Sequence, residues 1–249
     1  MTIARILVIA GSDSGGGAGI QADIRTVTML GGHAMTAITA ITAQNTLSVQ
    51  GVHAVPTNMV IAQMDSVVTD IGVDAVKIGM IGSAETAHAV ADYLLQMTEL
   101  PIIFDPVMVS TSGSALTDPG TTAAFERLMR IAALVTPNLP ELKALGGDSI
   151  AARYGCTVLA KGGHGEGEKL MDRLFDAQGE IARWEDRRID TEHTHGTGCT
   201  LASAIATGMA QGMALTDAIG RARQYVRAAL LAAPGLGGGH GPMGTPRHA

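Results

Sequence analysis

Residues 6–23 decide the fold class. They read Ile6-Leu7-Val8-Ile9-Ala10-Gly11-Ser12-Asp13-Ser14-Gly15-Gly16-Gly17-Ala18-Gly19-Ile20-Gln21-Ala22-Asp23. The apolar run 6–10 is typical of a short buried strand, and residues 21–30 have the pattern of a helix. The glycines between them let the backbone turn sharply and approach a ligand closely. A strand, a glycine-rich turn and a helix in this order begin a βαβ unit.

The same alternation of short apolar runs and helical patterns continues along the chain. It predicts further strands at 34–42, 75–78, 102–104, 134–136 and 157–160, and helices at 57–71, 84–97, 125–133, 200–213 and 215–232. Residues 174–188 are typical of a hairpin with its turn at Gln178-Gly179. Short strands that alternate with helices favour an α/β fold with a mainly parallel sheet, covered by helices on both faces.

The sequence contains no Pro-, Ser- or charge-rich linker, which predicts a single domain over residues 1–249. The tail after about residue 234 is rich in glycine and proline, as in Gly237-Gly238-Gly239-His240-Gly241-Pro242. That composition predicts a flexible end. Ligands of parallel sheets bind at the carboxyl ends of the strands, so the glycine and charged clusters that follow the strands mark the expected site.

The charge of the chain excludes some classes of partner. A formal net charge of −6 argues against nucleic acid, whose binding depends on clustered Lys and Arg. No apolar stretch reaches the roughly 18 residues of a membrane span, and the run 6–10 is too short for a signal peptide. Cys156 and Cys199 have neither a zinc-site nor a disulfide-framework spacing, which fits a reducing compartment. We therefore expect a cytoplasmic protein.

Two other glycine-rich nucleotide-binding turns have to be compared with the early glycine cluster. A dinucleotide-binding turn needs the spacing G-x-G-x-x-G, which Gly15, Gly17 and Gly19 do not give cleanly. A P-loop is excluded because no Gly-Lys-Ser/Thr follows. A tight turn without a ligand remains an alternative at this point.

Three further clusters follow predicted strands. They are Thr42-Ala43-Gln44-Asn45-Thr46, Thr136-Pro137-Asn138-Leu139-Pro140-Glu141 and Lys161-Gly162-Gly163-His164. Lys161 is a plausible point charge for phosphates, although most single lysines are only solvated. Asn138 and Glu141 fit either metal–phosphate binding or a helix capping box. The Gln44 amide fits either a ligand or a turn.

The segment His193-Thr194-His195-Gly196-Thr197-Gly198-Cys199-Thr200 opens a long helix of small residues. Backbone N–H groups at such a helix start form an anion site suited to phosphate. A helix N-terminus also lowers the pKa of a thiol, which predicts a reactive Cys199. A thiol hydrolase and simple packing of a buried cysteine are the alternatives.

The motifs at 11–23 and 193–200 closely resemble those of the hydroxymethylpyrimidine/phosphomethylpyrimidine kinases of thiamine biosynthesis, in the ribokinase-like superfamily. The resemblance covers nearly the whole chain, in order. It implies a three-layer α/β/α sandwich with a mainly parallel central sheet. It also implies ATP and Mg²⁺ as cofactors, a pyrimidine substrate and a homodimer. The reaction implied is phosphorylation of 4-amino-5-hydroxymethyl-2-methylpyrimidine and then of its monophosphate.

The resemblance assigns roles to residues of this chain. The substrate side comprises Gly11, Ala18, Asp23, Gln44, Met80 and Val107. Thr136, Asn138 and Lys161 face the ATP phosphates, and Asp105 and Glu141 hold Mg²⁺ largely through water. The catalytic residues are Gly196, Thr197 and Gly198, whose backbone forms the anion hole, and Cys199, which accepts the alcohol proton where many superfamily members have Asp. The glycine-rich tail lies near the nucleotide.

Two features depart from the family pattern. The stretch 144–160 looks shortened where relatives have a longer segment with a helix, and Thr42 replaces a more usual aliphatic residue near the pyrimidine. A pyridoxal or pyridoxine kinase on the same fold and a non-catalytic pyrimidine-binding protein therefore stay open as alternatives.

Overall fold

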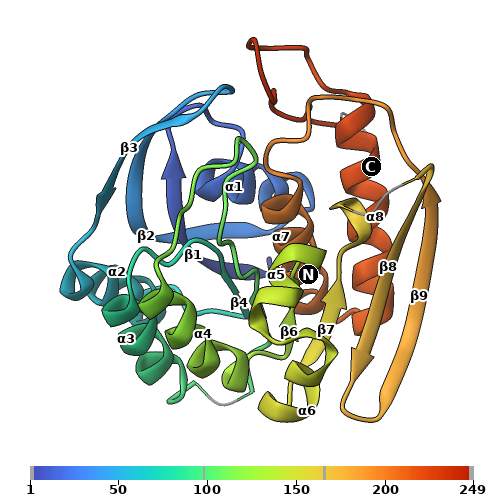
Figure 1. The fold of residues 1–249 in the computed structure, drawn as a ribbon. Helices are drawn as coiled ribbons and strands as arrows, with labels where there is room; N and C mark the ends of the chain where they lie inside the picture. Colours follow the sequence, from blue (N-terminus) through green and yellow to red (C-terminus); the bar gives the residue numbers. More distant parts are fainter. Residues whose placement is uncertain (1–2, 98, 165–166, 247–249) are drawn as a thin grey trace.

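The computed structural model describes residues 3–97, 99–164 and 167–246. Within these residues one nine-stranded sheet has the order β3-β2-β1-β4-β5-β6-β7-β8-β9 (Figure 1). Its strands are β1 (Arg5–Asp13), β2 (His33–Gln44), β3 (Val49–Ala54), β4 (Ala75–Ile78), β5 (Ile102–Phe104), β6 (Leu134–Val135), β7 (Thr157–Ala160), β8 (Lys169–Asp176) and β9 (Gly179–Arg187). The six central strands, β2, β1, β4, β5, β6 and β7, pair in parallel. Strand β3 at one edge and strands β8 and β9 at the other pair antiparallel.

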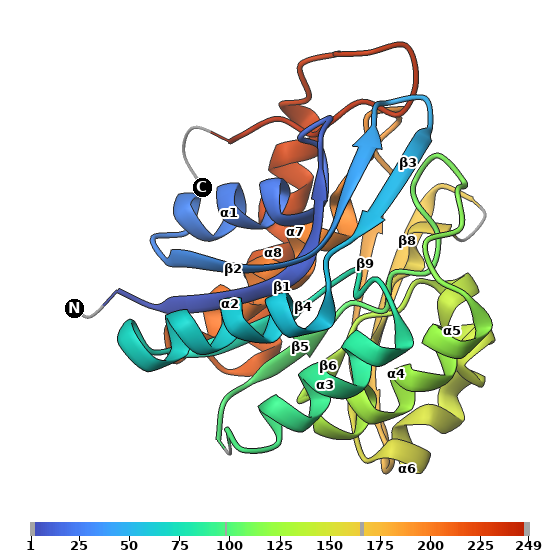
Figure 2. The same cartoon turned by 90° about the vertical axis from the view of Figure 1, so that its left-hand side faces the viewer.

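Helices cover both faces of the sheet (Figure 2). They are α1 (Gly19–Met29), α2 (Thr57–Asp70), α3 (Ala84–Leu94), α4 (Pro119–Ile131), α5 (Leu139–Leu145), α6 (Ile150–Tyr154), α7 (Thr197–Ala210) and α8 (Leu215–Leu231). In Figure 2, α1, α7 and α8 lie on one side of the strands, and α2, α3 and α4 on the other. This arrangement confirms the predicted α/β/α sandwich with a mainly parallel sheet.

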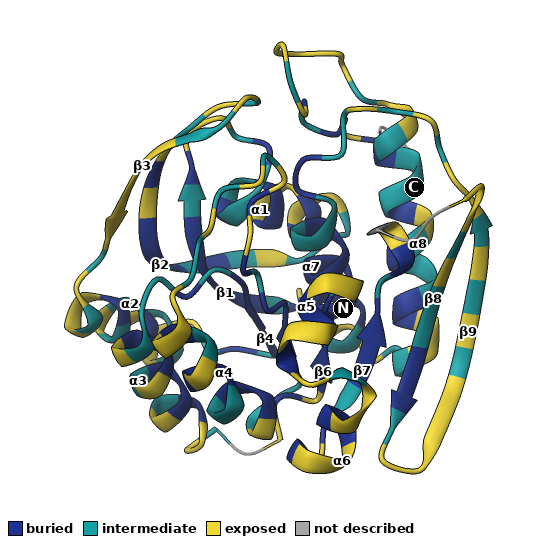
Figure 3. Ribbon diagram, in the orientation of Figure 1, coloured by how far each residue is buried: buried dark blue, intermediate teal, exposed yellow. Residues whose placement is uncertain are grey.

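Alternating side chains of the strands build two separate cores. In β1, Leu7 and Ile9 pack into the core under α2, α3 and α4, while Ile6 and Val8 pack under α1, α7 and α8. Successive side chains of a strand point to opposite faces, so a strand buried on both faces is mostly apolar. Figure 3 shows this burial in the central strands, in contrast to the exposed β3 and β9 at the edges.

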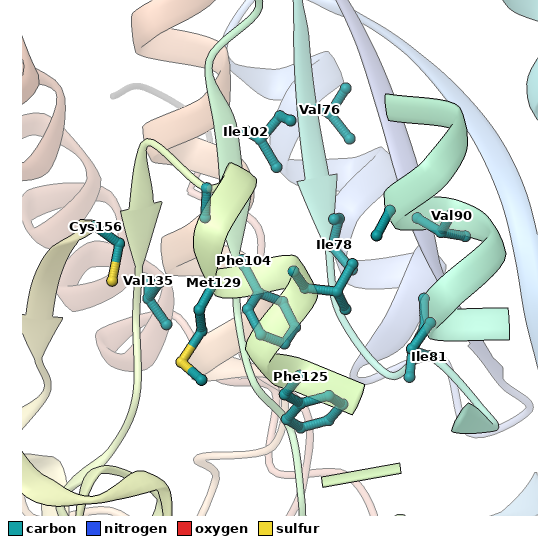
Figure 4. Close-up of a cluster of buried hydrophobic side chains, with 14 of the residues drawn as sticks. Val76, Ile78, Ile81, Val90, Ile102, Phe104, Phe125, Met129, Val135 and Cys156 are labelled. Carbon is teal, nitrogen blue, oxygen red and sulfur yellow. The ribbon is translucent and has the colours of Figure 1, made fainter. Parts of the chain in front are cut away.

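Two aromatic rings anchor the first of these cores (Figure 4). Phe104 of β5 meets Phe125 of α4 edge to face, with ring centroids 5.1 Å apart and an angle of 86° between the planes. With only three phenylalanines in the chain, most of the remaining volume is filled by aliphatic side chains and methionine. Large aromatic anchors set the spacing between α4 and the sheet, and smaller side chains fill around them.

Several elements differ from the sequence-based expectation. Helix α4 begins at Pro119, before the predicted residue 125, because the Asp118 side chain accepts the N–H of Thr121 and caps the helix. The hairpin begins at Lys169, and its turn precedes Gly179. The stretch 144–160 was expected to be shortened where relatives have a helix. It contains the short helix α6, which buries Ile150 and Tyr154 against the first core.

Among the described residues we found no helix with the length and apolar character that a crossing of a lipid bilayer requires.

Candidate active site

The candidate residues lie at the carboxyl ends of the parallel strands. Gly11–Ala18 end β1 and form the turn after it, Gln44 ends β2, and Met80 follows β4. Asp105 and Val107 follow β5, Thr136 follows β6 and Lys161 follows β7. Because parallel strands all end on the same side of the sheet, residues far apart in sequence are brought to one region, where ligands of such sheets bind.

The early glycine turn and the start of α7 are in direct contact. Gly196 has a φ of +86°, and a Cβ there would lie 2.0 Å from the carbonyl oxygen of Gly17. A Cβ on Gly17 would lie 2.4 Å from the imidazole of His195. Only glycine fits such contacts, because any side chain would overlap the neighbouring backbone or ring. Segments 11–23 and 196–199 therefore share one region of the molecule.

Asp13 organises this contact, although sequence reasoning did not single it out. Its carboxylate accepts the backbone N–H groups of Gly15, Gly17 and Ala18 at 2.8, 2.9 and 2.9 Å. It also lies 2.9 Å from Nε2 of His195. Burial acts to raise the pKa of Asp13, but the hydrogen bonds from His195 and the backbone outweigh it and hold the pKa below its ordinary value. The Asp13 carboxylate thus shapes the glycine turn and ties it to the residue that precedes Gly196.

A charged cluster lies beside the first turn of α7. Lys161 Nζ donates to Asp105 Oδ1 at 2.7 Å, and Thr136 Oγ1 donates to the same oxygen at 2.9 Å. A Cβ on Gly198 would lie 3.2 Å from both Asp105 Oδ2 and Lys161 Nζ. Burial disfavours the charged lysine, yet Asp105 and Glu141 outweigh it and raise the Lys161 pKa. A cation and the amide end of α7 are thereby placed together, as an anionic ligand requires.

The turn after Lys161 is fastened to the hairpin. Gly162 N–H donates to Asp172 Oδ1 at 2.8 Å, and a Cβ on Gly162 would lie 2.2 Å from the Met171 carbonyl oxygen. Arg223 of α8 donates to Asp172 Oδ2 at 2.7 Å and also pairs with Asp186 of β9. Helix α8, the hairpin and the glycine turn therefore form one connected support for the lysine.

Asp105 and Glu141 are the candidate metal carboxylates. Asp105 Oδ2 is buried and has no hydrogen-bond partner among the described residues. Glu141 forms the capping box of α5 with Asn138, through two hydrogen bonds of 2.8 Å, and burial raises its pKa even though Lys161 acts to lower it. In the described part of the chain no group of three or more His, Cys, Asp or Glu side chains could cage a metal. An unpartnered carboxylate oxygen fits a divalent cation that keeps most of its waters.

The helix-capping interpretation of Asn138 and Glu141 is confirmed by this geometry. The Asn138 side-chain oxygen accepts the N–H of Glu141, and Glu141 accepts the N–H of Asn138. The capping box fixes both side chains beyond the carboxyl end of β6, next to Lys161. Capping and a part in the site are compatible, because a capped glutamate retains a second carboxylate oxygen.

Cys199 lies in the first turn of α7, but the prediction that its pKa is lowered there is wrong. Burial raises the pKa of the thiol to about 11, and the nearby carboxylates of Asp23 and Asp105 act in the same direction. Lys77 and the backbone of Gly19 favour the thiolate without reversing the shift. Desolvation therefore outweighs the helix N-terminus in the ligand-free chain.

This shift predicts a slow thiol. We expect alkylation of Cys199 by iodoacetamide to accelerate with pH, with a midpoint near 11, because the thiolate is the reactive form. Peptide mass mapping of a pH series distinguishes Cys199 from Cys156. A midpoint below pH 8 would show instead that the helix start controls the thiol.

Asp23 does not present its carboxylate to a substrate in this structure. The side chain is fully buried, one oxygen accepting from Lys77 Nζ at 2.9 Å and the other from Ser203 Oγ at 2.7 Å. Burial opposes the charged lysine, but the attraction of Asp23 outweighs it and raises the Lys77 pKa above its ordinary value. The occupied carboxylate corrects the expectation that Asp23 is open to the alcohol. Its visible role is to join α1, β4 and α7.

The remaining substrate-side residues surround the glycine turn. A Cβ on Gly11 would lie 3.1 Å from the Met80 sulfur, so this thioether covers the backbone at the end of β1. The Gln44 side-chain nitrogen lies 3.3 Å from His195 Nε2. Val107 is partly exposed in the loop after β5. The structure brings Gly11 to Met80 and brings Gln44 to the start of α7.

The glycine-rich tail packs against both the turn after β2 and the segment before α7. Cβ atoms on Gly237 and Gly239 would lie 2.3 and 2.4 Å from atoms of Thr46. The carbonyl oxygen of Gly241 accepts the N–H of His195 at 3.2 Å. The tail therefore contacts both the Gln44 side of the site and the segment that leads into α7, and its place near the nucleotide stays a prediction.

Comparison with known proteins identifies the family. The model of the phosphomethylpyrimidine kinase family matches residues 13–244, which include both the glycine turn and the start of α7. The chain belongs to this family. A hydroxymethylpyrimidine/phosphomethylpyrimidine kinase of Rhizobium meliloti is 46% identical over 254 residues, which cover 95% of each protein. A thiamine biosynthesis bifunctional protein of Geobacter sulfurreducens is 48% identical over 252 residues. That alignment covers 96% of this chain but 51% of the bifunctional protein, so the chain spans about half of its length.

Solved structures of kinases share the fold. Bacillus subtilis pyridoxal kinase, in its ADP complex, superposes with a TM-score of 0.88 at 32% identity over 98% of this chain and 97% of that one. Phosphomethylpyrimidine kinase of Clostridium difficile gives a TM-score of 0.77 at 35% identity over 90% of this chain and 98% of that one. Membership of the phosphomethylpyrimidine kinase family makes the chain a kinase that uses ATP and a small-molecule substrate.

Proposed function

We propose that this chain transfers phosphate from ATP to 4-amino-5-hydroxymethyl-2-methylpyrimidine and then to the resulting monophosphate. One observation carries the proposal. The glycine turn after β1, expected to hold the ring, touches the amide end of α7, expected to hold the phosphoryl group, at Gly17 and Gly196. Family membership over residues 13–244 supports the same reaction.

One set of residues contacts the phosphates and another contacts the pyrimidine. The backbone N–H groups of Gly196, Thr197 and Gly198 stabilise charge that develops on the transferred group, and Lys161 neutralises the phosphates beside them. Gln44, Met80, Ala18 and the backbone at Gly11 hold the pyrimidine. Positioning and electrostatics supply most of the rate in phosphoryl transfer, which matches a site built from amides and one lysine.

The carboxylates of Asp105 and Glu141 are the residues that would hold Mg²⁺. The unpartnered Asp105 oxygen and the proximity of Lys161 fit a hydrated divalent cation. Such a cation would supply positive charge for the phosphates when bound. Thr136 keeps Asp105 oriented through its hydroxyl, and Asn138 keeps Glu141 in place.

Cys199 is proposed to accept the proton of the substrate alcohol. We expect Cys199→Ala to lower kcat about 100-fold or more, since positioned acid–base groups contribute roughly 10²–10⁴. Because the thiol pKa lies near 11, kcat/KM of the unmodified chain is expected to rise with pH through the neutral range. Cys156→Ala is the matched control, since Cys156 packs in the core on the other face. Full activity of Cys199→Ala would remove the thiol from the mechanism.

The test of the function is ATP turnover with defined acceptors. The chain would be incubated with ATP, Mg²⁺ and either hydroxymethylpyrimidine, its monophosphate or pyridoxal, and products separated by mass. We expect mono- and diphosphate of the pyrimidine. Ring binding without ATP consumption would instead identify a non-catalytic pyrimidine-binding protein.

Pyridoxal kinase is a second candidate. The superposition on Bacillus subtilis pyridoxal kinase, with a TM-score of 0.88, favours it specifically. A pyridoxal rate above the pyrimidine rate in the same assay would make it the main activity.

Two properties of the protein in solution are also proposed. A homodimer is supported by Ile41, Leu47 and Val52, which are exposed apolar side chains at the β2–β3 edge, and sedimentation would test it. Cys156 and Cys199 are both free thiols, which supports a reducing, cytoplasmic setting. Fractionation of the producing cells would test the compartment.

A further inference from the structure

His195 is a buried residue at which several segments of the chain meet. Its Nε2 lies 2.9 Å from Asp13 Oδ2, at the glycine turn, and its Nδ1 lies 3.3 Å from Thr111 Oγ1, in the loop after β5. Its backbone N–H donates to the Gly241 carbonyl oxygen of the tail at 3.2 Å. The next residue is Gly196, the first of the expected anion-hole amides. One side chain therefore contacts both the glycine turn and a loop that borders the site.

Both ring nitrogens of His195 are engaged by groups of the protein. The pKa of Asp13 is held below its ordinary value, so its carboxylate is ionised at neutral pH and can only accept. His195 Nε2 therefore carries a hydrogen and donates it to Asp13, while the longer contact with Gln44 Nε2, at 3.3 Å, does not use this hydrogen. Nδ1 is left to Thr111, whose hydroxyl can donate or accept. This arrangement indicates a structural role of the imidazole toward its neighbours, without proton exchange with a substrate.

The imidazole also sets the spacing between the glycine turn and α7. A Cβ on Gly17 would lie 2.4 Å from His195 Cδ2, so the space between them does not admit even one methyl group. Because Gly196 follows His195 in the chain, a shift of the ring shifts the first amide of the anion hole as well. A displacement of about 1 Å between reacting groups can lower a rate about 100-fold.

The loop 107–118 reaches His195 from the other side of the site. It folds back on itself, with the Ser110 N–H donating to the Ser114 carbonyl oxygen at 2.8 Å. Thr111 lies in the turn between them and is exposed, so the backbone of the loop does not need its hydroxyl. The contact of Thr111 with His195 joins this turn to the segment that leads into α7.

We propose that His195 is a positioning residue for phosphoryl transfer, whose two ring nitrogens bind Asp13 and Thr111 and thereby hold the glycine turn, the loop 107–118 and the anion hole in one fixed arrangement. This inference rests on the proposed function, because it takes the glycine turn as the ring site and the start of α7 as the phosphoryl site. His195 acts through the segments that it joins.

The kinetic test compares two substitutions of His195. His195→Leu removes both ring nitrogens, whereas His195→Gln keeps an N–H that can donate to Asp13. We expect His195→Leu to lower kcat at least about tenfold through misplacement of the acceptor, and His195→Gln to recover most of this loss. The KM for ATP should stay constant, because β5 and β7 hold Asp105 and Lys161 independently of the imidazole.

A second measurement needs no catalysis. Hydrogen exchange followed by mass spectrometry would be recorded on the full chain for peptides that cover residues 11–23 and 107–118. We expect His195→Leu to speed exchange in both segments, because both lose their contact with the ring. Thr111→Val should speed exchange in 107–118 alone, since the contact of His195 with Asp13 remains. His88→Leu, at an exposed position of α3, is the matched control and should change neither segment.

The outcomes separate this inference from the proposed function. Equal kcat values of His195→Leu and the unmodified chain, or equal losses in His195→Leu and His195→Gln, would overturn the inference. Unchanged exchange of 107–118 in Thr111→Val would also overturn it, and this result can be obtained even if His195→Leu does not fold. Absence of ATP turnover in the unmodified chain would refute the proposed function, whereas the exchange data would still show whether His195 joins the two segments.

Discussion

Gly196→Ala is expected to lower kcat/KM by at least about 100-fold, the loss seen when one anion-hole donor is removed. The reason is steric. Gly196 has a φ of +86°, and a Cβ there would lie 2.0 Å from the Gly17 carbonyl oxygen, so either the glycine turn or the start of α7 must move. Steady-state kinetics with the pyrimidine and ATP would measure it, and circular dichroism would show whether the fold is retained.

Gly220→Ala is the matched control for this substitution. Gly220 lies inside α8, and a Cβ there would meet no atom within 4 Å. Alanine in a helix interior is favoured over glycine by about 0.5–1 kcal/mol. The Gly220→Ala variant should therefore keep its kcat/KM and unfold at a slightly higher temperature. Near-normal kinetics of Gly196→Ala would show that the contact between the two segments is dispensable.

Lys77→Met is expected to lower the free energy of unfolding by about 3–5 kcal/mol, because it leaves the Asp23 carboxylate buried without its cation. Both side chains of the pair are fully buried, and the Nζ to Oδ2 distance is 2.9 Å. Among the described residues, Ser203 then remains as the one hydrogen-bond partner of the Asp23 side chain. Urea unfolding followed by circular dichroism would measure the change.

Two further variants make this prediction specific. Lys77→Met combined with Asp23→Asn should recover part of the loss, because the buried charge is gone. Arg127→Ala, which breaks an exposed pair with Asp92, should lower the free energy of unfolding far less than Lys77→Met, because water screens an exposed pair. Equal effects of Lys77→Met and Arg127→Ala would contradict a stabilising buried pair.

The fold was predictable wherever burial on both faces forces an apolar strand. Strands β4, β5 and β7 match the predicted 75–78, 102–104 and 157–160, since each is a short run that is apolar apart from Lys77 in β4 and Thr157 in β7. Strand β3 was missed because it is an exposed edge strand without an apolar pattern. Helices α5 and α6, with 7 and 5 residues, are too short for helical periodicity to mark them.

The site was predictable as a set of loops and less so as a set of contacts. The order of the motifs indicated which strand ends carry chemistry, and the structure brings those ends together. The Asp13–His195 pair joins residues 182 positions apart, which no local pattern reveals. A signal for Lys77 existed, because a lysine within the four-residue buried strand β4 requires a buried carboxylate. The thiol of Cys199 was misjudged because desolvation depends on everything packed around it.

The course of the glycine-rich tail has a practical consequence for anyone who produces this protein. Gly237 and Gly239 pack closely on Thr46, and Gly241 accepts the N–H of His195, before the chain returns to α8, where the Gly244 N–H donates to the Ala229 carbonyl oxygen. A version of the protein trimmed before Gly237, for example to help it crystallise, would therefore lose the segment that covers Thr46 and holds the backbone of His195. The tail should be kept whole when the boundaries of the expressed protein are chosen.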